Sequence, residues 1–326
     1  MFRHLVAAVA VTALLILVSA GCDGGTTSEK RNGGERALVV GFSQVGAESA
    51  WRTANTKSIK EEAAKRGITL RFSDAQQKQE NQITAVRNFI AQKVDVILLA
   101  PVVETGFEPV LRDAKQAGIP VVLSDRRANV SDESLYATFI GSDFVEEGRR
   151  AARFLVEKTG GQAVIAELQG TPGSAPAIDR KKGFEEVIRQ HPGMKVVLSQ
   201  TGDFTRAKGK EVMEAFLKTS EGQGITALYA HNDDMAIGAI QAIEAAGRKP
   251  GTDIIIVSVD GVKAAFEAMV EGKLNCTVEC NPLIGPQVFD LVEKVARGEA
   301  VPKRVDVAEG VYTQEQAKEA LPHRHY

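Results

Sequence analysis

The chain has few residues that could form a disulfide or bind a metal. It has only three cysteines, and two of them, Cys276 and Cys280, lie in a segment rich in β-branched residues. If that segment is a strand, positions four apart are ~13 Å from each other, which is too far for a disulfide. The chain has five histidines, none at a metal-site spacing, namely His4, His191, His231, His323 and His325. We therefore expect no metal and no other cofactor.

The sequence also lacks an excess of charge and several catalytic motifs. Its net charge is −2, with 44% apolar and 25% charged residues, which describes a globular body with no bulk attraction to nucleic acid. It contains no Gly-Xaa-Ser-Xaa-Gly turn and no phosphate-binding loop. Aromatic residues make up 6% of the chain, and Trp51 is its only tryptophan.

The N-terminus is typical of an exported lipoprotein. Residues 1–22 contain a short basic head, an apolar run and small residues before Cys22, so we expect a removed signal and lipidation of Cys22. Because Ser19 replaces the usual Leu or Val, cleavage by the ordinary peptidase or a retained anchor remains an alternative. Residues 23–36 have the composition of a flexible tether. Asp23 resembles an inner-membrane retention signal, although it could simply solvate the tether. We therefore expect a periplasmic protein on the inner membrane, or on the outer face where there is one membrane.

Short β-branched runs alternate with helical patterns through the rest of the chain. This alternation, over roughly 290 residues, predicts an α/β protein with two doubly wound parallel-sheet lobes. The predicted strands are 37–42, 68–72, 94–100, 120–123, 138–140, 163–168, 195–199, 225–229, 254–259 and 274–278. The predicted helices include 53–66, 82–92, 107–117, 181–190, 207–218, 234–246 and 262–270. A ligand should bind between the lobes, where the carboxyl ends of the strands converge.

Polar and aromatic residues follow these strands repeatedly. The candidates are Trp51, Arg52, Asp125, Arg126, Arg180 at a helix start, Phe204, Asn232 and Asp260. Carboxylates, amides and guanidinium groups suit the hydroxyls of a neutral sugar, and aromatic faces cover its C–H faces. Alternatively, Phe204 could be core packing, and Asp125 with Arg126 could be a structural ion pair. We expect Asp234 to cap the helix that follows Asn232.

From Ala37 to about Thr313 the chain resembles the periplasmic sugar-binding proteins of bacterial ATP-driven importers, in the ribose-binding group with the type I fold. The resemblance is carried by Gly41-Phe42-Ser43-Gln44, Trp51-Arg52, Ser124-Asp125-Arg126, Asp179-Arg180-Lys181-Lys182-Gly183-Phe184, Gly202-Asp203-Phe204, His231-Asn232-Asp233-Asp234 and Val259-Asp260-Gly261. Within this group, the sequence is most similar to that of members that bind galactofuranose.

The resemblance implies a monosaccharide ligand, galactofuranose or a related furanose. Trp51 and Phe204 would stack on the ring, and Asp125, Arg126, Arg180, Asn232 and Asp260 would hydrogen-bond its hydroxyls, with Arg52 close by. Cys280 stands where ribose binders have Gln, and Arg52 where they have a second stacking Phe, which disfavours ribose. Glu279 could replace the lost Gln. The arginines should keep the site carboxylates ionised.

The resemblance also implies a mechanism of binding by closure. We expect an N-terminal lobe of residues 37–141 plus 281–308 and a C-terminal lobe of 142–280 plus 309–322, joined by hinge strands that cross near 141–142, 280–282 and 308–312. A monomer would deliver its sugar to an ABC permease, touching the membrane only through the lipid anchor. Three alternatives remain: a receptor for a chemoreceptor or sensor kinase, a glycoside-processing enzyme, and a sugar-responsive transcription regulator. The last would need a DNA-binding head, which residues 1–36 do not resemble.

Overall fold

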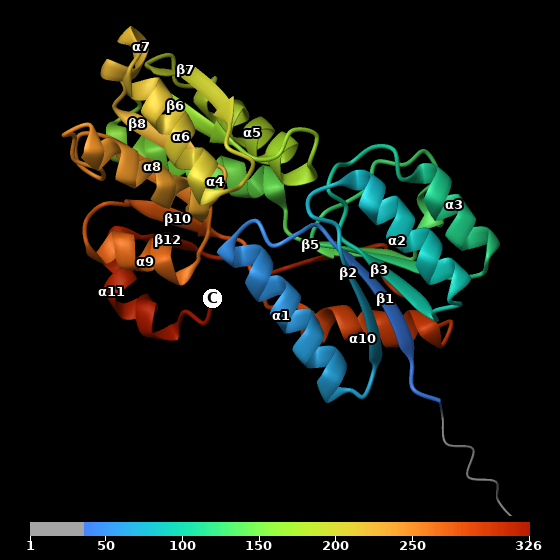
Figure 1. The fold of residues 1–326 in the computed structure, drawn as a ribbon. Coiled ribbons are helices and arrows are strands. Elements are labelled where there is room, and N and C mark those ends of the chain that lie inside the picture. Colours follow the sequence, from blue (N-terminus) through green and yellow to red (C-terminus); the bar gives the residue numbers. More distant parts are fainter. Residues whose placement is uncertain (1–35) are drawn as a thin grey trace, which may run out of the picture. The chain divides into compact units, whose positions relative to one another are not determined.

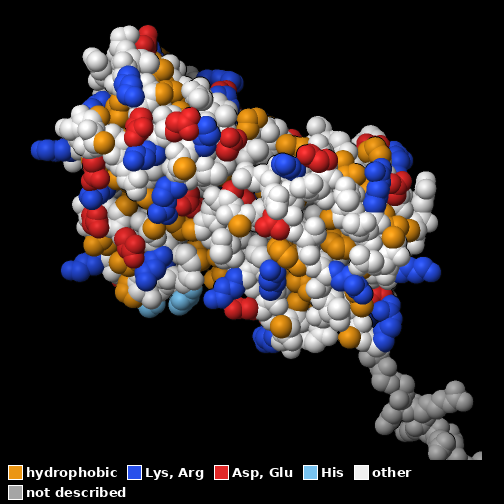
Figure 2. Space-filling view, viewed as in Figure 1, with side chains coloured by type: hydrophobic (Ala, Val, Ile, Leu, Met, Phe, Trp, Pro, Cys, Tyr) orange, Lys and Arg blue, Asp and Glu red, His pale blue; other side chains and the backbone are white. Residues whose placement is uncertain are grey.

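The computed structural model describes residues 36–326, of which Ala37–Tyr326 form one compact unit. The predicted signal, Cys22 and nearly all of the tether lie outside the described residues. Within residues 36–326, no helix combines the length and the apolar character needed to cross a bilayer. Figure 2 shows cationic and anionic side chains interspersed over the visible face of this unit, so neither sign of charge dominates there.

The chain forms two sheets of six strands each, which confirms the predicted fold class (Figure 1). The first sheet is entirely parallel and has the order β11-β5-β4-β3-β1-β2. Its strands are β1 Val39–Gln44, β2 Thr69–Asp74, β3 Val96–Leu99, β4 Val121–Ser124, β5 Thr138–Gly141 and β11 Arg304–Asp306. We call this sheet and the helices packed on it the first lobe. Those helices are α1 Ala50–Lys65, α2 Gln79–Ala91, α3 Glu108–Gln116 and α10 Gly285–Ala296, with a short 3-10 turn at Glu133–Leu135.

The second sheet has the order β12-β10-β9-β8-β6-β7, in which only β12 runs antiparallel to its neighbour. Its strands are β6 Ala163–Gln169, β7 Met194–Thr201, β8 Ala227–Ala230, β9 Ile255–Asp260, β10 Cys276–Glu279 and β12 Val311–Thr313. This sheet and its helices are the second lobe. The helices are α4 Phe144–Thr159, α5 Ala175–Ile188, α6 Arg206–Leu217, α7 Ser220–Gln223, α8 Asp233–Ala245, α9 Lys263–Val270 and α11 Gln314–Ala320, followed by a 3-10 turn at Leu321–His323.

Helices cover both faces of the first sheet because its central strands are apolar on both faces. On β3, Val96 and Leu98 pack with residues of α1 and α10, whereas Ile97 and Leu99 pack with residues of α2 and α3. All four side chains are fully buried. The two-residue alternation of a strand thus places successive residues in two different cores.

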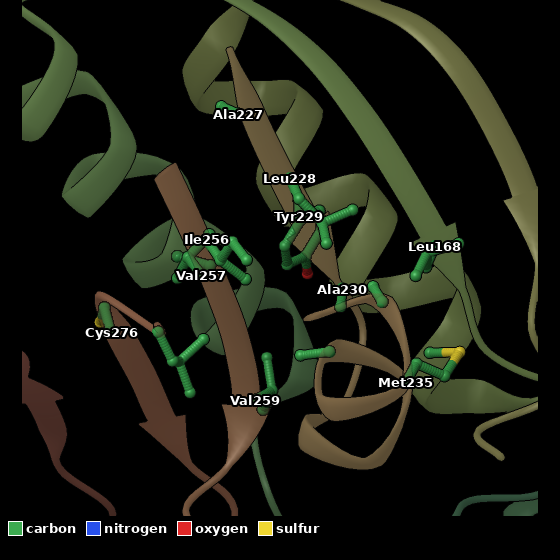
Figure 3. Close-up of a cluster of buried hydrophobic side chains, with 14 of the residues drawn as sticks. Leu168, Ala227, Leu228, Tyr229, Ala230, Met235, Ile256, Val257, Val259 and Cys276 are labelled. Carbon is green, nitrogen blue, oxygen red and sulfur yellow. The ribbon is translucent and has the colours of Figure 1, made fainter. Parts of the chain in front are cut away.

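A separate core fills the second lobe around β6, β8, β9 and β10 (Figure 3). Tyr229 on β8 is fully buried and stacks on Phe184 of α5, with ring centroids 4.1 Å apart. Trp51 belongs to this same cluster although it lies on α1 of the first lobe. One aromatic side chain therefore reaches from the first lobe into the packing of the second.

The described chain passes between the sheets at three places. It leaves β5 for α4 through residues 142–143, leaves β10 for α10 through residues 280–284, and leaves β11 for β12 through residues 307–310. The prediction did not name α4 or α10. It also placed Arg180 at a helix start, which is wrong, because α5 begins at Ala175 with Pro176 in its first turn, a position that tolerates proline.

Candidate functional site

All eight predicted site residues line one cavity between the lobes. Trp51 and Arg52 lie in the first turn of α1, and Asp125 and Arg126 follow β4. The second lobe contributes Arg180 from α5, Phe204 from the turn before α6, Asn232 before α8, and Asp260 from the end of β9. The walls are completed by Glu48, Ser49, Phe144, Pro176 and Cys280.

The cavity is small in this structure. Its volume is about 20 Å³, which is space for a single water molecule. Pockets for small molecules are usually roughly 300–1,000 Å³. A ring-sized ligand can enter only after the lobes or the lining side chains move apart.

The first-lobe wall of the cavity is a buried network of charges. The Arg52 guanidinium lies 2.6 Å from Asp125 and 3.1 Å from Glu48, and all three side chains are at most 5% exposed. Burial alone would lower the pKa of Arg52, but these two carboxylates raise it. Burial and the nearby Arg52 charge lower the pKa of Arg126 to about 10. Arg126 also donates to the Val102 carbonyl over 3.0 Å, which fixes the direction of its side chain.

Arg180 organises the second-lobe wall. Its Nε donates to Glu147 over 2.7 Å, its Nη1 donates to the His231 carbonyl over 2.6 Å, and its Nη2 lies 3.5 Å from Asp260. Burial raises the pKa of Asp260 well above its usual range, and Arg180 offsets this only in part. Arg180 offsets burial only in part because its nearer carboxylate partner is Glu147. The expectation that the arginines keep the site carboxylates ionised stays a prediction.

The two predicted aromatic residues lie at the same cavity and not in separate cores. Trp51 is 5% exposed and Phe204 is 4% exposed. Arg52 lies over the Trp51 ring at 4.6 Å, and Arg126 lies over the Phe204 ring at 5.4 Å. The indole Nε1–H of Trp51 donates to the Cys280 carbonyl over 2.6 Å. The apolar faces of both rings are thus held beside the polar groups of the walls.

Three cavity residues have backbone conformations that L-amino acids rarely adopt. The φ angles are +64° for Asp125, +59° for Phe204 and +127° for Asp260. Positive φ in non-glycine residues costs of order 1–3 kcal/mol each and persists where the surroundings enforce it. Such strain at three strand ends of one cavity is typical of a functional site.

Asn232 caps a helix besides lining the cavity, and Asp234 has a role different from the one predicted. Asn232 is the N-cap of α8, since its Oδ1 accepts from the Met235 N–H over 3.0 Å and its Nδ2 donates to the Phe204 carbonyl over 3.1 Å. The prediction that Asp234 caps this helix is wrong. Asp234 is the second residue of α8. Its carboxylate accepts from the Ala50 N–H of the first lobe over 2.7 Å and pairs with Arg206.

Glu279 does not line the cavity, so the prediction that it replaces the missing Gln is wrong. It accepts from the Gly310 N–H over 3.0 Å and pairs with Arg324 at 2.6 Å. The physical reason is the alternation of side chains along β10, which turns Cys280 toward the cavity and Glu279 away from it. Cys276 and Cys280 are both buried free thiols, as the spacing argument predicted.

Glu48 is the main site residue that the sequence prediction missed. Its side chain is 2% exposed, and its second oxygen, Oε2, is buried without a hydrogen-bond partner. It lies in the loop between β1 and α1, four residues before Arg52. Its position just after a strand is the sequence feature that could have identified it as a site residue. Among the described residues, one group could in principle offer metal ligands, Glu147 with Cys280 and Glu309, but Arg180 already pairs with Glu147.

Larger cavities lie elsewhere in the described part of the chain. One of about 390 Å³ is lined by Glu104, Arg127, Tyr136, Phe139 and Arg304 among others, and none of the eight predicted residues contributes to it. Beside it Arg127 pairs with Glu104 at 2.5 Å and with Asp179 of the second lobe. This cavity therefore adjoins a contact between the lobes and is separate from the candidate site.

Comparison with known proteins identifies the family. The profile of the family described as "Periplasmic binding protein domain" matches residues 40–300. The galactofuranose-binding protein YtfQ of Escherichia coli is 52% identical over 287 residues, which cover 87% of this chain and 90% of that protein.

Two solved structures agree closely with this one. The arabinose transporter binding protein of Shewanella sp. ANA-3, bound to α- and β-L-arabinofuranose, is 55% identical with a TM-score of 0.86, over 88% of this chain and 96% of the other. A Mycobacterium smegmatis protein in complex with β-D-fucofuranose is 55% identical with a TM-score of 0.87, over 89% and 96%. With this fold, this cavity between two lobes and these relatives, the chain belongs to the periplasmic binding proteins, a family of extracytoplasmic sugar-binding components of ABC transporters.

Proposed function

We propose that this protein captures a monosaccharide in its furanose form between its lobes and delivers it to an ABC permease. One observation carries the proposal: two aromatic rings, three arginines, two aspartates and one asparagine from both lobes surround a single buried cavity. Their chemistry matches a ring with apolar C–H faces and a rim of hydroxyls. The named ligands of two relatives, L-arabinofuranose and β-D-fucofuranose, and the name of a third support the furanose ring form.

The roles proposed for the side chains follow from their surroundings. Trp51 and Phe204 stack on the sugar ring, and Asp125, Arg126, Arg180 and Asp260 bond its hydroxyls. Asn232 has already used one N–H and its oxygen on the protein, so it offers the sugar one remaining N–H. Arg52 orients Asp125 through their 2.6 Å contact.

Closure of the lobes supplies the mechanism. The sugar binds one lobe, and the other swings over it about the three crossings, because contacts drawn from both lobes favour the closed form. We propose the lobe division 37–141 plus 281–308 and 142–280 plus 309–322 for this movement. The protein acts as a monomer, and the permease accepts the closed form.

A binding assay with a sugar panel tests the proposal. Purified residues 23–326 are titrated with L-arabinose, D-fucose, D-galactose and D-ribose, each equilibrated with its furanose form, while thermal unfolding is followed. A ligand at about 100 times its dissociation constant stabilises the protein by ~2.7 kcal/mol. We expect L-arabinose, D-fucose or D-galactose to raise Tm in the wild type, and the same sugar to have little effect on Trp51→Ala. Absence of a shift with every sugar would refute the proposal.

We further propose that the sugar leaves chemically unchanged. Incubation with aryl furanosides should release no aryl alcohol, and steady release by pure protein would instead indicate a glycoside-processing enzyme. Deletion of the partner permease should abolish sugar uptake. Two results together would instead indicate a receptor for a chemoreceptor or sensor kinase. Sugar uptake would persist in the permease deletion strain, and a strain without the binding protein would lose a sugar-dependent signalling response.

We propose that Cys22 is lipidated and that the protein is retained at the inner membrane. Labelling cells with a radioactive fatty acid should label the wild type but not Cys22→Ser. Fractionation should place the labelled protein with the inner membrane, or on the outer face of the membrane in an organism with only one. Unlabelled, fully released wild-type protein would contradict the anchor without affecting the sugar proposal.

A further inference from the structure

One carboxyl group connects the three crossings between the lobes. Glu309 lies in the third crossing, between β11 and β12. Its Oε1 accepts a hydrogen bond from the Asn281 N–H of the second crossing over 3.1 Å, and a short one from the Ser142 hydroxyl of the first. Any rotation of one lobe against the other changes the relative positions of these three segments, so it must act on this group.

The same carboxyl group is also linked to the sugar cavity. Ligand atoms of Glu309, Glu147 and Cys280 lie within 4.8 Å of one another. Cys280 lines the cavity, and the Ser142 hydroxyl is 3.4 Å from its sulfur. Glu147 is 1% exposed and receives Arg180 of the cavity wall on one oxygen, at 2.7 Å. A continuous series of contacts therefore runs from Arg180 to the crossings.

The cluster has more buried acid than cation. The groups facing Glu309 are the carboxylate of Glu147, the thiol of Cys280 and the guanidinium of Arg180, while Arg150 donates to the Glu309 backbone carbonyl over 3.1 Å. Burial and the neighbouring Glu147 raise the pKa of Glu309 to about 9. Burial also raises the pKa of Cys280, which therefore stays a thiol. Glu147 Oε1 is buried and has no hydrogen-bond partner.

We propose that Glu309 is the positioning residue that joins the three crossings and sets how readily the lobes close on the sugar. This inference rests on the proposed sugar-binding function. Its Oε1 accepts from Ser142 and Asn281, and its proton removes a negative charge beside the buried carboxylate of Glu147. Glu147 in turn keeps Arg180 directed at the cavity.

The sign of the pH dependence follows from this arrangement. Opening the lobes admits water to Glu309 and returns its pKa toward that of an ordinary glutamate, so the closed form binds one more proton than the open form at neutral pH. The contribution of this group to closure is complete below about pH 4, the ordinary pKa range of a glutamate, and falls progressively as the pH rises from there to about 9. Sugar affinity should therefore fall as the pH is raised.

The test compares three variants with the wild type, using L-arabinose and D-fucose as probes in calorimetric titrations from about pH 6 to about pH 9. Glu309→Gln keeps the acceptor and a fixed N–H donor, so it should bind at the level of the wild type in mild acid and lose the pH slope. Glu309→Ala leaves both donors unsatisfied and should bind about tenfold more weakly at every pH. Glu299→Gln, on the exposed turn after α10, should match the wild type throughout.

A readout without sugar separates this inference from the proposed function. Hydrogen exchange at residues 141–143 and 280–282 should be faster in Glu309→Ala than in the wild type. If Glu309→Ala does not fold, Ser142→Ala replaces it in this experiment and should show a smaller increase in exchange rate. Wild-type binding with a pH slope retained in Glu309→Gln would overturn the inference alone. Absence of wild-type binding to any sugar, with the exchange pattern as expected, would overturn the sugar-binding function alone.

Discussion

The indole of Trp51 in the first lobe donates a 2.6 Å hydrogen bond to the backbone carbonyl of Cys280, at the end of a strand of the second lobe. The ring is also part of the hydrophobic cluster of the second lobe. Trp51 is therefore both a wall of the cavity and a contact that holds the lobes together.

Replacement of Trp51 should separate these two roles. Trp51→Phe keeps an aromatic face but loses the donor, so we expect sugar affinity to fall about fivefold, as for a loss of ~1 kcal/mol. Trp51→Ala should also cost ~3 kcal/mol of unfolding free energy because it removes the buried ring. Calorimetry and urea unfolding measure the two effects. Equal affinities for Trp51→Phe and the wild type would show that the hydrogen bond does not contribute to closure.

Arg52 should matter more for stability than either of its carboxylate partners. Arg52→Met leaves Glu48 and Asp125 buried without their cation, so we expect a loss of about 3–5 kcal/mol. Asp125→Asn leaves Arg52 with Glu48 and should cost only about 1–3 kcal/mol. Lys57→Met, on the exposed side of the same helix, is the matched control and should be neutral. A smaller loss for Arg52→Met than for Asp125→Asn would contradict this order.

Gly170 controls the position of the Phe204 ring. A Cβ atom on Gly170 would lie 1.9 Å from Cζ of Phe204, so Gly170→Ala must displace the ring. We expect a stability loss of about 1–3 kcal/mol and weaker sugar binding. Gly224→Ala is the control, because its Cβ would meet nothing closer than 3.5 Å. Unchanged sugar affinity in Gly170→Ala would show that the ring is not needed in its present place.

Arg324 and Tyr326 contact residues in and next to the candidate site. Arg324 lies over the rings of Tyr312 at 4.1 Å and Phe266 at 4.5 Å and pairs with Glu279, while the Tyr326 hydroxyl donates to the Asp260 carbonyl over 3.3 Å. Deleting residues 324–326 should lower Tm and weaken sugar binding through the Asp260 loop. His323→Ala, which is exposed, should do neither. Truncated protein with wild-type affinity would limit these residues to a stabilising role.

Much of the site could be predicted because its residues follow strands. Parallel strands end at one edge of each sheet, and a ligand binds between two such edges, so the sequence alone was enough to expect Asp125 of the first lobe near Asp260 and Phe204 of the second. Those strands could be identified because each contains a short stretch of β-branched and other apolar residues and is followed by turn residues.

The errors have a common cause in contacts that depend on the partner lobe. Local capping preferences cannot show that Asp234 accepts the Ala50 N–H of another lobe, or that Asn232 takes the capping position in its place. Likewise, the direction of the pKa shift of Asp260 depends on the balance between burial and Arg180, which requires the packed structure. Glu309 gave no signal in the sequence because its partners, Ser142 and Asn281, are 167 and 28 positions away.

The position of β11 has a consequence for how the protein is made. This three-residue strand completes the edge of a sheet whose other strands all lie between residues 39 and 141. A polypeptide that emerges from the ribosome N-terminus first must keep the β5 edge unpaired until residues 304–306 arrive. Long-range pairing of this kind is slow and leaves apolar strands open to aggregation during biosynthesis. Holdase chaperones that shield the nascent chain should therefore be needed at least until residues 304–306 have been translated.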